Sequence, residues 1–197
     1  MQTFLRKMLD LQLALTFILV IVETLLLNLK QLRSEIYLMK VIMGADPLGY
    51  ELKEAVKGHL LAQGITVEDI TPTNDVGYFV VGEMLGKRIA TGEFNRGLIF
   101  CGTGIGVNIV ANKYQGIYSA LCESVETARL ARVINNANVL AMGGIIMTPY
   151  LAKQMADTFL TTTFSEGLSE AEPTFLKNAY QDVQATAARI TAFNQSH

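Results

Sequence analysis

The sequence predicts an α/β protein: a five-stranded parallel Rossmann-like sheet with helices on both faces, forming a three-layer αβα sandwich, followed by a C-terminal helix. Three observations predict this class. Short aliphatic runs alternate with amphipathic stretches from residue 40 onward. The 197 residues are 50% hydrophobic, which is enough for one domain with a sizeable core. The segments between the strands are long enough for helical crossovers, which join parallel strands.

Strands and helices are expected in strict alternation. The predicted order is strand 40–45, helix 50–63, strand 65–70, helix 80–91, strand 97–101, helix 106–113, strand 117–122, helix 124–134, strand 138–142, helix 149–159 and helix 173–193.

Local signals support these boundaries. The first helix carries apolar residues at helical spacing and ends before Gly64, a typical C-terminal glycine. Pro72 and Asn74 mark a turn after the second strand. Ser124 is the predicted N-cap of the fourth helix, and Pro149 suits the first position of the fifth. Ligands of such sheets gather at the carboxyl ends of the strands, so the residues that follow the strands are the first functional candidates.

Residues 1–38 form a hydrophobic N-terminal extension, distinct from the domain predicted over residues 39–197. Residues 11–22 are uncharged and mostly aliphatic, and the apolar run approaches a membrane-spanning length. Glu23 interrupts it, which is costly in a bilayer, and no cleavage site follows. We favour a misassigned start, with Met39 as the native one, over a membrane anchor or an appended helix. Membrane contact is expected only if the extension is native.

Composition excludes several classes of function. The chain has 16 basic and 18 acidic residues and no basic run, which argues against nucleic-acid binding. Its two cysteines, Cys101 and Cys122, cannot form a disulfide framework, so a reducing cytoplasm is expected. The two histidines and two cysteines show no metal-ligand spacing, and we predict no metal site.

The most informative stretch is residues 99–113, which read I-F-C-G-T-G-I-G-V-N-I-V-A-N-K. Cys101 ends the predicted strand, and Gly102, Gly104 and Gly106 follow at alternating positions before a helix. A strand, a glycine turn and a helix start make a pocket lined with backbone N–H groups, which stabilises negative charge. A thiol at the mouth of this pocket suggests proton abstraction beside an oxyanion hole.

Two other interpretations of this stretch are possible. It resembles a dinucleotide fingerprint, but G-x-G-x-G lacks the spacing of G-x-G-x-x-G, and no acidic residue closes a second strand about 20 residues later. A bound nucleotide cofactor is therefore not expected. A buried cysteine is also often inert, so the local pattern alone leaves Cys101 open between a catalytic and a structural role.

Several linked motifs carry a family resemblance. They are M-K-V-I-M-G-A-D at 39–46, G-Y-E-L-K at 49–53, C-G-T-G-I-G…A-N-K at 101–113, A-L-C at 120–122, T-A-R-L-A-R at 127–132 and N-N-A-N-V-L at 135–140. In this order they resemble the type B ribose-5-phosphate isomerases and the lactose-pathway galactose-6-phosphate isomerases, over residues 39–163. The resemblance implies an aldose–ketose isomerisation of a phosphorylated sugar, ribose 5-phosphate or galactose 6-phosphate, through a cis-enediolate and without a cofactor.

The resemblance also implies roles for individual residues. Cys101 matches the base that carries a proton between C2 and C1, and Thr103 matches a residue that assists ring opening. The enediolate oxygen would be held by the backbone amides of Gly102, Gly104, Ile105 and Gly106.

Three further positions match substrate-binding residues of the family. Asp46 matches an acid that contacts sugar hydroxyls, Tyr78 a tyrosine beside the sugar, and Asn135 an asparagine that binds substrate oxygens. Without the resemblance, the presence of Asp46 and Asn135 is explained equally well by hydrogen bonding in turns and helix caps.

The sequence also departs from the family pattern. The usual Asp-His pair is Asp46-Pro47, the ring-opening histidine aligns with Ile134, and a family arginine aligns with Ile145. The C-terminal segment that supplies phosphate-binding arginines aligns near residues 166–172, which carry acids instead. A phosphate dianion would therefore lack its usual guanidinium contacts.

Three hypotheses accommodate these departures. The family's active site lies between two subunits, and this chain keeps only the half with Asp, Cys and the glycine loop, as the B subunit of galactose-6-phosphate isomerase does. It would then work as a heteromer with an A-type subunit. Alternatively, a homodimer acts on a four-carbon sugar phosphate, which cannot close a normal ring and needs no ring-opening histidine. The third hypothesis is a relative that binds but does not catalyse.

Overall fold

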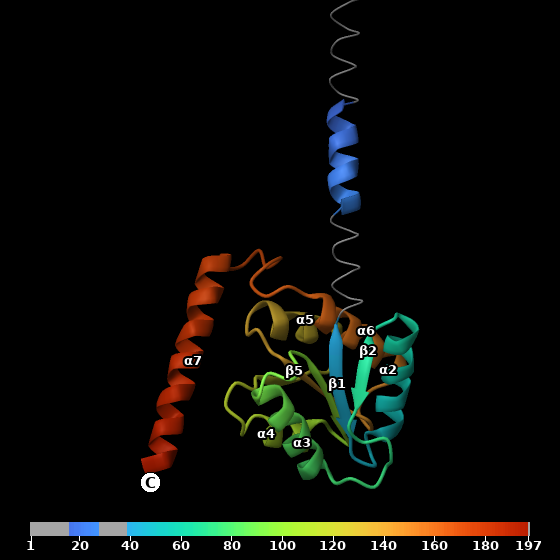
Figure 1. Ribbon diagram of the computed structural model, residues 1–197, viewed down its shortest axis with the longest axis vertical. Coiled ribbons are helices and arrows are strands. Elements are labelled where there is room, and N and C mark those ends of the chain that lie inside the picture. The colour runs from blue at the N-terminus through green and yellow to red at the C-terminus, as the bar shows by residue number, and fades with distance from the viewer. Residues whose placement is uncertain (1–15, 28–38, 197) are drawn as a thin grey trace, which may run out of the picture. The chain divides into compact units, whose positions relative to one another are not determined.

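The computed structural model describes residues 16–27 and 39–196 (Figure 1). The chain divides into two compact units, Met1–Met39 and Lys40–His197. Residues 16–27 of the first unit are helical with exposed side chains, and the rest of the predicted extension lies outside the described residues. Among the helices that the structure describes, none combines the length and apolar character needed to cross a membrane.

The second unit is built on a five-stranded sheet. Its strands are β1 (Lys40–Ala45), β2 (Thr66–Asp69), β3 (Gly97–Cys101), β4 (Ser119–Leu121) and β5 (Val139–Gly143). All four pairings are parallel, and the order is β2-β1-β3-β5-β4. The central strands β3 and β5 are buried along their whole length, as expected for a sheet covered on both faces. The predicted sheet is confirmed.

Helices cover both faces of this sheet. They are α2 (Tyr50–Ala62), α3 (Tyr78–Ala90), α4 (Ile105–Ala111), α5 (Val125–Val133), α6 (Pro149–Thr161) and α7 (Pro173–Ser196). Helix α6 packs against both α2 and α5 on one face, while α3 and α4 pack together on the other (Figure 1). Helix α7 runs along the side of the unit, and of its side chains only Leu176 is buried. The predicted three layers and C-terminal helix are confirmed.

Local chemistry sets the helix starts. Ser124 and Thr127 form a reciprocal capping box at the start of α5, and Thr148 caps α6 one residue before Pro149. The helix predicted over residues 80–91 begins earlier, at Tyr78, because Gly77 takes the extended backbone of an N-cap. This shift places Tyr78 in the first turn of α3, directly after the carboxyl edge of the sheet.

A buried ion network joins α2 to that edge. Lys53 is fully buried, and its Nζ lies 2.8 and 3.0 Å from the carboxylate oxygens of Asp69. The same Nζ donates to the carbonyl of Thr71 at 2.5 Å. The Thr71 hydroxyl in turn accepts a hydrogen bond from the backbone N–H of Ala45 at 2.8 Å. Because a buried charge must be paired, this network fixes the end of β1, where Asp46 follows.

This network predicts acid sensitivity. Burial raises the pKa of the Asp69 carboxyl, but hydrogen bonds from Lys53, Lys57 and Thr71 outweigh it and leave the pKa below its ordinary 3.8. The pKa of Glu54 lies below 4.5, because the bonds from Lys57 and Lys53 likewise outweigh burial. Both groups bind protons more weakly in the folded state. Their stabilisation is therefore complete above about pH 5 and is lost as the pH falls toward 3 and below.

Urea unfolding across this pH range measures the effect. We expect the free energy of unfolding to decrease steadily on acidification, with a shallower decrease in an Asp69→Asn variant. A wild-type free energy that stays constant from about pH 5 to pH 3 would contradict the proposed linkage.

Candidate active site

The sulfur of Cys101 lies at the carboxyl edge of the sheet, inside the turn that follows β3. Cys101 is the last residue of β3 and is 4% exposed. Its Sγ accepts a hydrogen bond from the backbone N–H of Gly104 at 3.2 Å. An N–H donor aimed at sulfur stabilises negative charge there, which suits a thiol that acts as a base.

Gly104 must be glycine for this turn to form. It has φ +78°, and a Cβ at this position would lie 2.5 Å from the Leu121 side chain and 2.9 Å from the backbone of Met142. The turn is also held from the side by β5: the Gly144 N–H donates to the Cys101 carbonyl at 2.8 Å, and the Ile145 N–H to the Gly102 carbonyl at 3.0 Å. The neighbouring strand therefore fixes the loop.

A Gly104→Ala substitution is expected to lower kcat/KM by about 100-fold, because the added methyl group would displace the amide that faces sulfur. Gly116→Ala is the matched control. Gly116 also has a left-handed backbone, with φ +83°, but a Cβ there meets nothing within 4 Å. It should cost about 1 to 3 kcal/mol of stability and leave activity intact. Steady-state kinetics and thermal unfolding measure both effects, and equal activity losses in the two variants would contradict the loop's role.

Tyr78 is brought to the same loop. Its ring covers Gly106 so closely that a Cβ there would lie 2.8 Å from the ring. The ring also meets Phe79 edge to face at 5.6 Å, and the Tyr78 side chain remains half-exposed. The structure thus places Tyr78 beside the glycine turn, where the sequence predicted a tyrosine beside the sugar.

Asp46 is held in a turn next to Cys101. One carboxylate oxygen, Oδ1, accepts from the N–H groups of Leu48 at 3.0 Å and Gly49 at 2.9 Å. Gly49 in turn packs on β3, since a Cβ there would lie 2.7 Å from the Cys101 nitrogen. The turn chemistry offered as an alternative explanation is therefore present. Within the described part of the chain the other carboxylate oxygen, Oδ2, has no hydrogen-bond partner, so this atom is available to bind substrate.

Thr103 lies within the turn itself. Its hydroxyl accepts a hydrogen bond from the Ile105 N–H at 3.3 Å. The backbone of Thr103 touches the β5 loop, because a Cβ at Gly143 would lie 2.8 Å from its carbonyl. Thr103 and Ile105 thus lie in the same turn as the three glycines, and the N–H of Gly104 is the group that contacts the sulfur.

Asn135 is the exception. It is exposed and follows α5, just before β5, whereas Cys101 ends β3. Because the strands are parallel, these two residues lie at opposite edges of the sheet, and the structure does not bring them together within one chain. Ile134, where the resemblance places a ring-opening histidine, lies at the same amino edge as Asn135.

Apolar side chains surround the Cys101 loop, and the sequence analysis did not anticipate them. Five of them are exposed at this edge: Leu48, Ile105, Ile145, Ile146 and Tyr150. The three loops that meet there, residues 46–49, 101–106 and 143–148, contain no lysine or arginine. Exposed aliphatic residues directly after strand ends were the signal that could have identified this apolar rim without cations.

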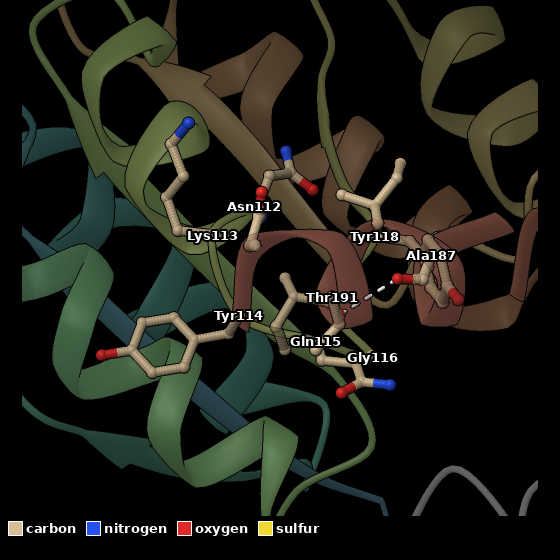
Figure 2. Close-up of a pocket in the computed structure, with 11 residues that line it drawn as sticks. Asn112, Lys113, Tyr114, Gln115, Gly116, Tyr118, Ala187 and Thr191 are labelled. Carbon is tan, nitrogen blue, oxygen red and sulfur yellow. Dashed lines mark hydrogen bonds between the residues drawn. The ribbon is translucent and has the colours of Figure 1, made fainter. Parts of the chain in front are cut away.

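A cavity of about 310 Å³ lies elsewhere, between α7 and the loop that joins α4 to β4 (Figure 2). Asn112, Lys113 and Tyr118 line one side, and Ala187 and Thr191 of α7 line the other. This loop leads into β4 at the amino edge of the sheet, so the cavity contains none of the residues around Cys101. Both cysteines are free and buried, and burial raises the pKa of the Cys122 thiol, which suits a structural role.

Comparisons with known proteins agree with this geometry. A family model described as Ribose/Galactose Isomerase matches residues 41–174. The 4-deoxy-4-sulfo-D-erythrose isomerase of Clostridium sp. (strain MSTE9) is 45% identical over 155 residues, 77% of this chain and 98% of that protein. The D-erythrulose-4-phosphate isomerase of Pectobacterium atrosepticum is 37% identical over 133 residues, 66% and 88% of the two chains.

A solved structure extends the similarity to the fold. The crystal structure of a ribose 5-phosphate isomerase from Thermotoga maritima matches with a TM-score of 0.67 and 37% identity, covering 75% of this chain and 99% of the other. The family predicted from the sequence motifs is thereby confirmed. The chain belongs to the ribose/galactose isomerase family and is an aldose–ketose isomerase.

Proposed function

We propose that this chain interconverts the aldose and ketose forms of a four-carbon sugar with an anionic group at C4, and that a sulfonate is preferred to a phosphate. The observation that carries the proposal is the 45% identity to 4-deoxy-4-sulfo-D-erythrose isomerase over 98% of its length. The similarity to a D-erythrulose-4-phosphate isomerase also supports a substrate with four carbons.

The chemistry of a four-carbon substrate explains the missing histidine. An aldose whose C4 carries a sulfonate or phosphate has no free hydroxyl there to attack the aldehyde, so it stays open. An enzyme for such a substrate needs no acid to open a ring. Ile134 can therefore stand where the family resemblance places a histidine without loss of activity.

The charge of the site favours a sulfonate. A sulfonate carries one negative charge, whereas a phosphate monoester carries about −1.5 to −2 at neutral pH. The three loops around Cys101 contain no cation and one acid, Asp46. The weaker repulsion and lower desolvation cost of a monoanion suit such a rim.

The reaction follows from the geometry of the loop. The Cys101 thiolate removes the proton from C2, the C1–C2 double bond forms, and the electrons of the carbonyl bond move to O1. We assign stabilisation of this oxygen to the amides of Gly102 and Gly106, because those of Gly104 and Ile105 donate to Cys101 Sγ and to the Thr103 hydroxyl. The thiol then returns a proton to C1, while the O2 proton passes to O1, leaving the ketone at C2. We assign Asp46 Oδ2 and Tyr78 to the remaining hydroxyl groups.

The separation of Cys101 from Asn135 supports a site shared by two subunits. If Asn135 binds substrate oxygens, it must reach the Cys101 loop of another chain. We infer a homodimer, because a four-carbon substrate requires none of the residues that an A-type partner would add. A heteromer with an A-type subunit is the competing proposal.

The test compares substrates on the purified chain alone. We expect turnover of 4-deoxy-4-sulfo-D-erythrose and of D-erythrose 4-phosphate, with kcat/KM for the sulfonate at least about 100-fold above that for ribose 5-phosphate. Adding an A-type galactose-6-phosphate isomerase subunit should change nothing. A chain that is inactive alone and gains activity only with that subunit would overturn the four-carbon proposal in favour of the half-site.

A further inference from the structure

Four buried polar atoms lack a hydrogen-bond partner among the described residues, and all belong to segments that meet at the amino edge of the sheet. They are Nε of Arg96, Oγ of Ser119, Nε of Arg132 and Oγ of Ser165. Arg96 directly precedes β3, Ser119 opens β4, Arg132 lies in the last turn of α5, and Ser165 follows α6. Buried polar atoms without partners are rare in native proteins, so four in one region indicate a missing partner.

Backbone hydrogen bonds join these segments. The N–H of Ser165 donates to the carbonyl of Val133, next to Arg132, at 2.9 Å. Asn138, directly before β5, links the other two: its carbonyl accepts from the N–H of Gly97 at 2.9 Å, and its N–H donates to the carbonyl of Tyr118 at 3.0 Å. Arg96 and Ser119 are the chain neighbours of Gly97 and Tyr118, so the atoms without partners come from adjoining segments.

The two guanidinium groups also lack a counter-charge. Arg132 is 2% exposed, and its Nη1 donates only to neutral oxygens, at 2.9 Å to Asn136 and 2.6 Å to the Ala137 carbonyl. Arg96 donates to the carbonyl of Asn95 at 2.8 Å. Within the described residues neither arginine pairs with a carboxylate. A buried cation without an anion is costly to the folded state.

The charge of one arginine affects the pKa of the other, as expected for neighbouring groups. Burial, together with the charge of Arg96, lowers the pKa of Arg132 to about 10. Both groups remain charged at neutral pH and repel each other. An anion between them would remove this repulsion and supply the missing acceptors.

Aromatic residues cover the same region. The ring of Tyr180, on α7, lies 5.3 Å from the rings of Tyr118 and Phe164. Burial, and then the neighbouring Tyr180 phenol, raise the pKa of Tyr118. Tyr118 also lines the cavity beside α7 (Figure 2).

We propose that this amino edge binds a tetrahedral oxyanion, the chemistry shared by inorganic phosphate and the phosphate or sulfonate group of a small metabolite. Guanidinium groups bind such anions through paired N–H donors, and the serine hydroxyls add two more donors. Within one chain the site lies at the opposite edge of the sheet from the Cys101 loop. None of its four polar groups is among the residues that we assign to the substrate.

Calorimetry and thermal unfolding of the full chain test the proposal with two probes, inorganic phosphate and erythritol 4-phosphate, against sodium chloride of equal ionic strength. We expect saturable binding of at least one probe, and the tighter probe identifies the source of the anion. Arg96→Met should weaken that binding at least about 10-fold. Arg129→Met is the matched control, because Arg129 lies on α5 but already pairs with Glu126 at the surface.

Arg132→Met is the second variant and should also weaken binding. If Arg132→Met does not fold, Arg96→Met alone tests the proposal. Arg96→Met should fold, because Arg96 donates only to an exposed backbone carbonyl. Crystals soaked in selenate should show an anomalous peak between the two guanidinium groups. Absence of saturable binding of either probe, or unchanged binding in Arg96→Met, overturns the proposal.

Discussion

Replacing Cys101 by serine is expected to reduce kcat by about 10²- to 10⁴-fold while leaving the fold intact. Positioned general bases contribute rate factors of this size, and a serine hydroxyl is a far weaker acid than a thiol, so it supplies almost no anionic base at neutral pH. The loop should persist, because its shape is set by Gly104 and by the β5 hydrogen bonds rather than by sulfur. KM should change little, since Cys101 touches the reacting carbon and not the anionic end of the substrate.

Cys122→Ser provides the matched control for the Cys101 variant. Both cysteines are buried at strand ends, but only Cys101 faces the glycine turn. Steady-state assays and thermal unfolding of both variants measure the contrast. Retention of more than about a tenth of the wild-type kcat in Cys101→Ser would rule out proton transfer by the thiol.

The second large effect is expected on stability. Lys53→Met should lower the free energy of unfolding by about 3 to 5 kcal/mol, the usual cost of removing one partner of a buried ion pair. The substitution leaves the partly buried Asp69 without its fully buried cation and the Thr71 carbonyl without its donor. Because Thr71 also holds the N–H of Ala45, the turn at Asp46 should loosen, and KM should rise in the fraction that folds.

Lys57→Met is the comparison for this prediction. Lys57 contacts the same carboxylate at 2.6 Å, but its side chain is 24% exposed, so solvent replaces much of its interaction. We expect a loss of about 1 kcal/mol or less. Urea unfolding at neutral pH compares the two, and equal losses would show that burial of Lys53 is not the source of its effect.

Periodicity and turn chemistry predicted most of the fold, because they act locally. The five strands, the N-cap at Ser124, the helix start at Pro149 and the strand–glycine–helix turn at Cys101 can all be predicted from short windows of sequence. The start of α3 was misplaced by two residues, since the extended backbone of Gly77 is invisible in the apolar pattern. This error hid the position of Tyr78 in the first turn of that helix.

The site was less predictable, because it depends on which edge of the sheet each residue reaches. Asp46, Tyr78 and the Cys101 turn follow strands and meet at the carboxyl edge. Asn135 precedes a strand, so it lies at the other edge, although its motif matched equally well. Motif order alone does not show whether matching residues come from one chain or two.

Burial of charged residues also escaped sequence reasoning. Lys53 and Arg132 lie on helices whose patterns indicate ordinary polar positions, yet both side chains are buried. Lys53 is paired with carboxylates, whereas Arg132 has no carboxylate partner among the described residues. Only the tertiary packing distinguishes a stabilising network from a site that lacks an anion.

The most direct test of the role of Cys101 follows the hydrogen at C2. Wild-type enzyme would convert C2-deuterated 4-deoxy-4-sulfo-D-erythrose in ordinary water, with the ketose analysed by NMR and mass spectrometry. We predict a primary isotope effect and partial loss of deuterium to solvent, since a thiol that holds the proton can exchange it, and conversion at least about 100-fold slower by Cys101→Ser. Complete retention of deuterium at C1, or conversion by Cys101→Ser at the wild-type rate, would contradict base catalysis by this sulfur.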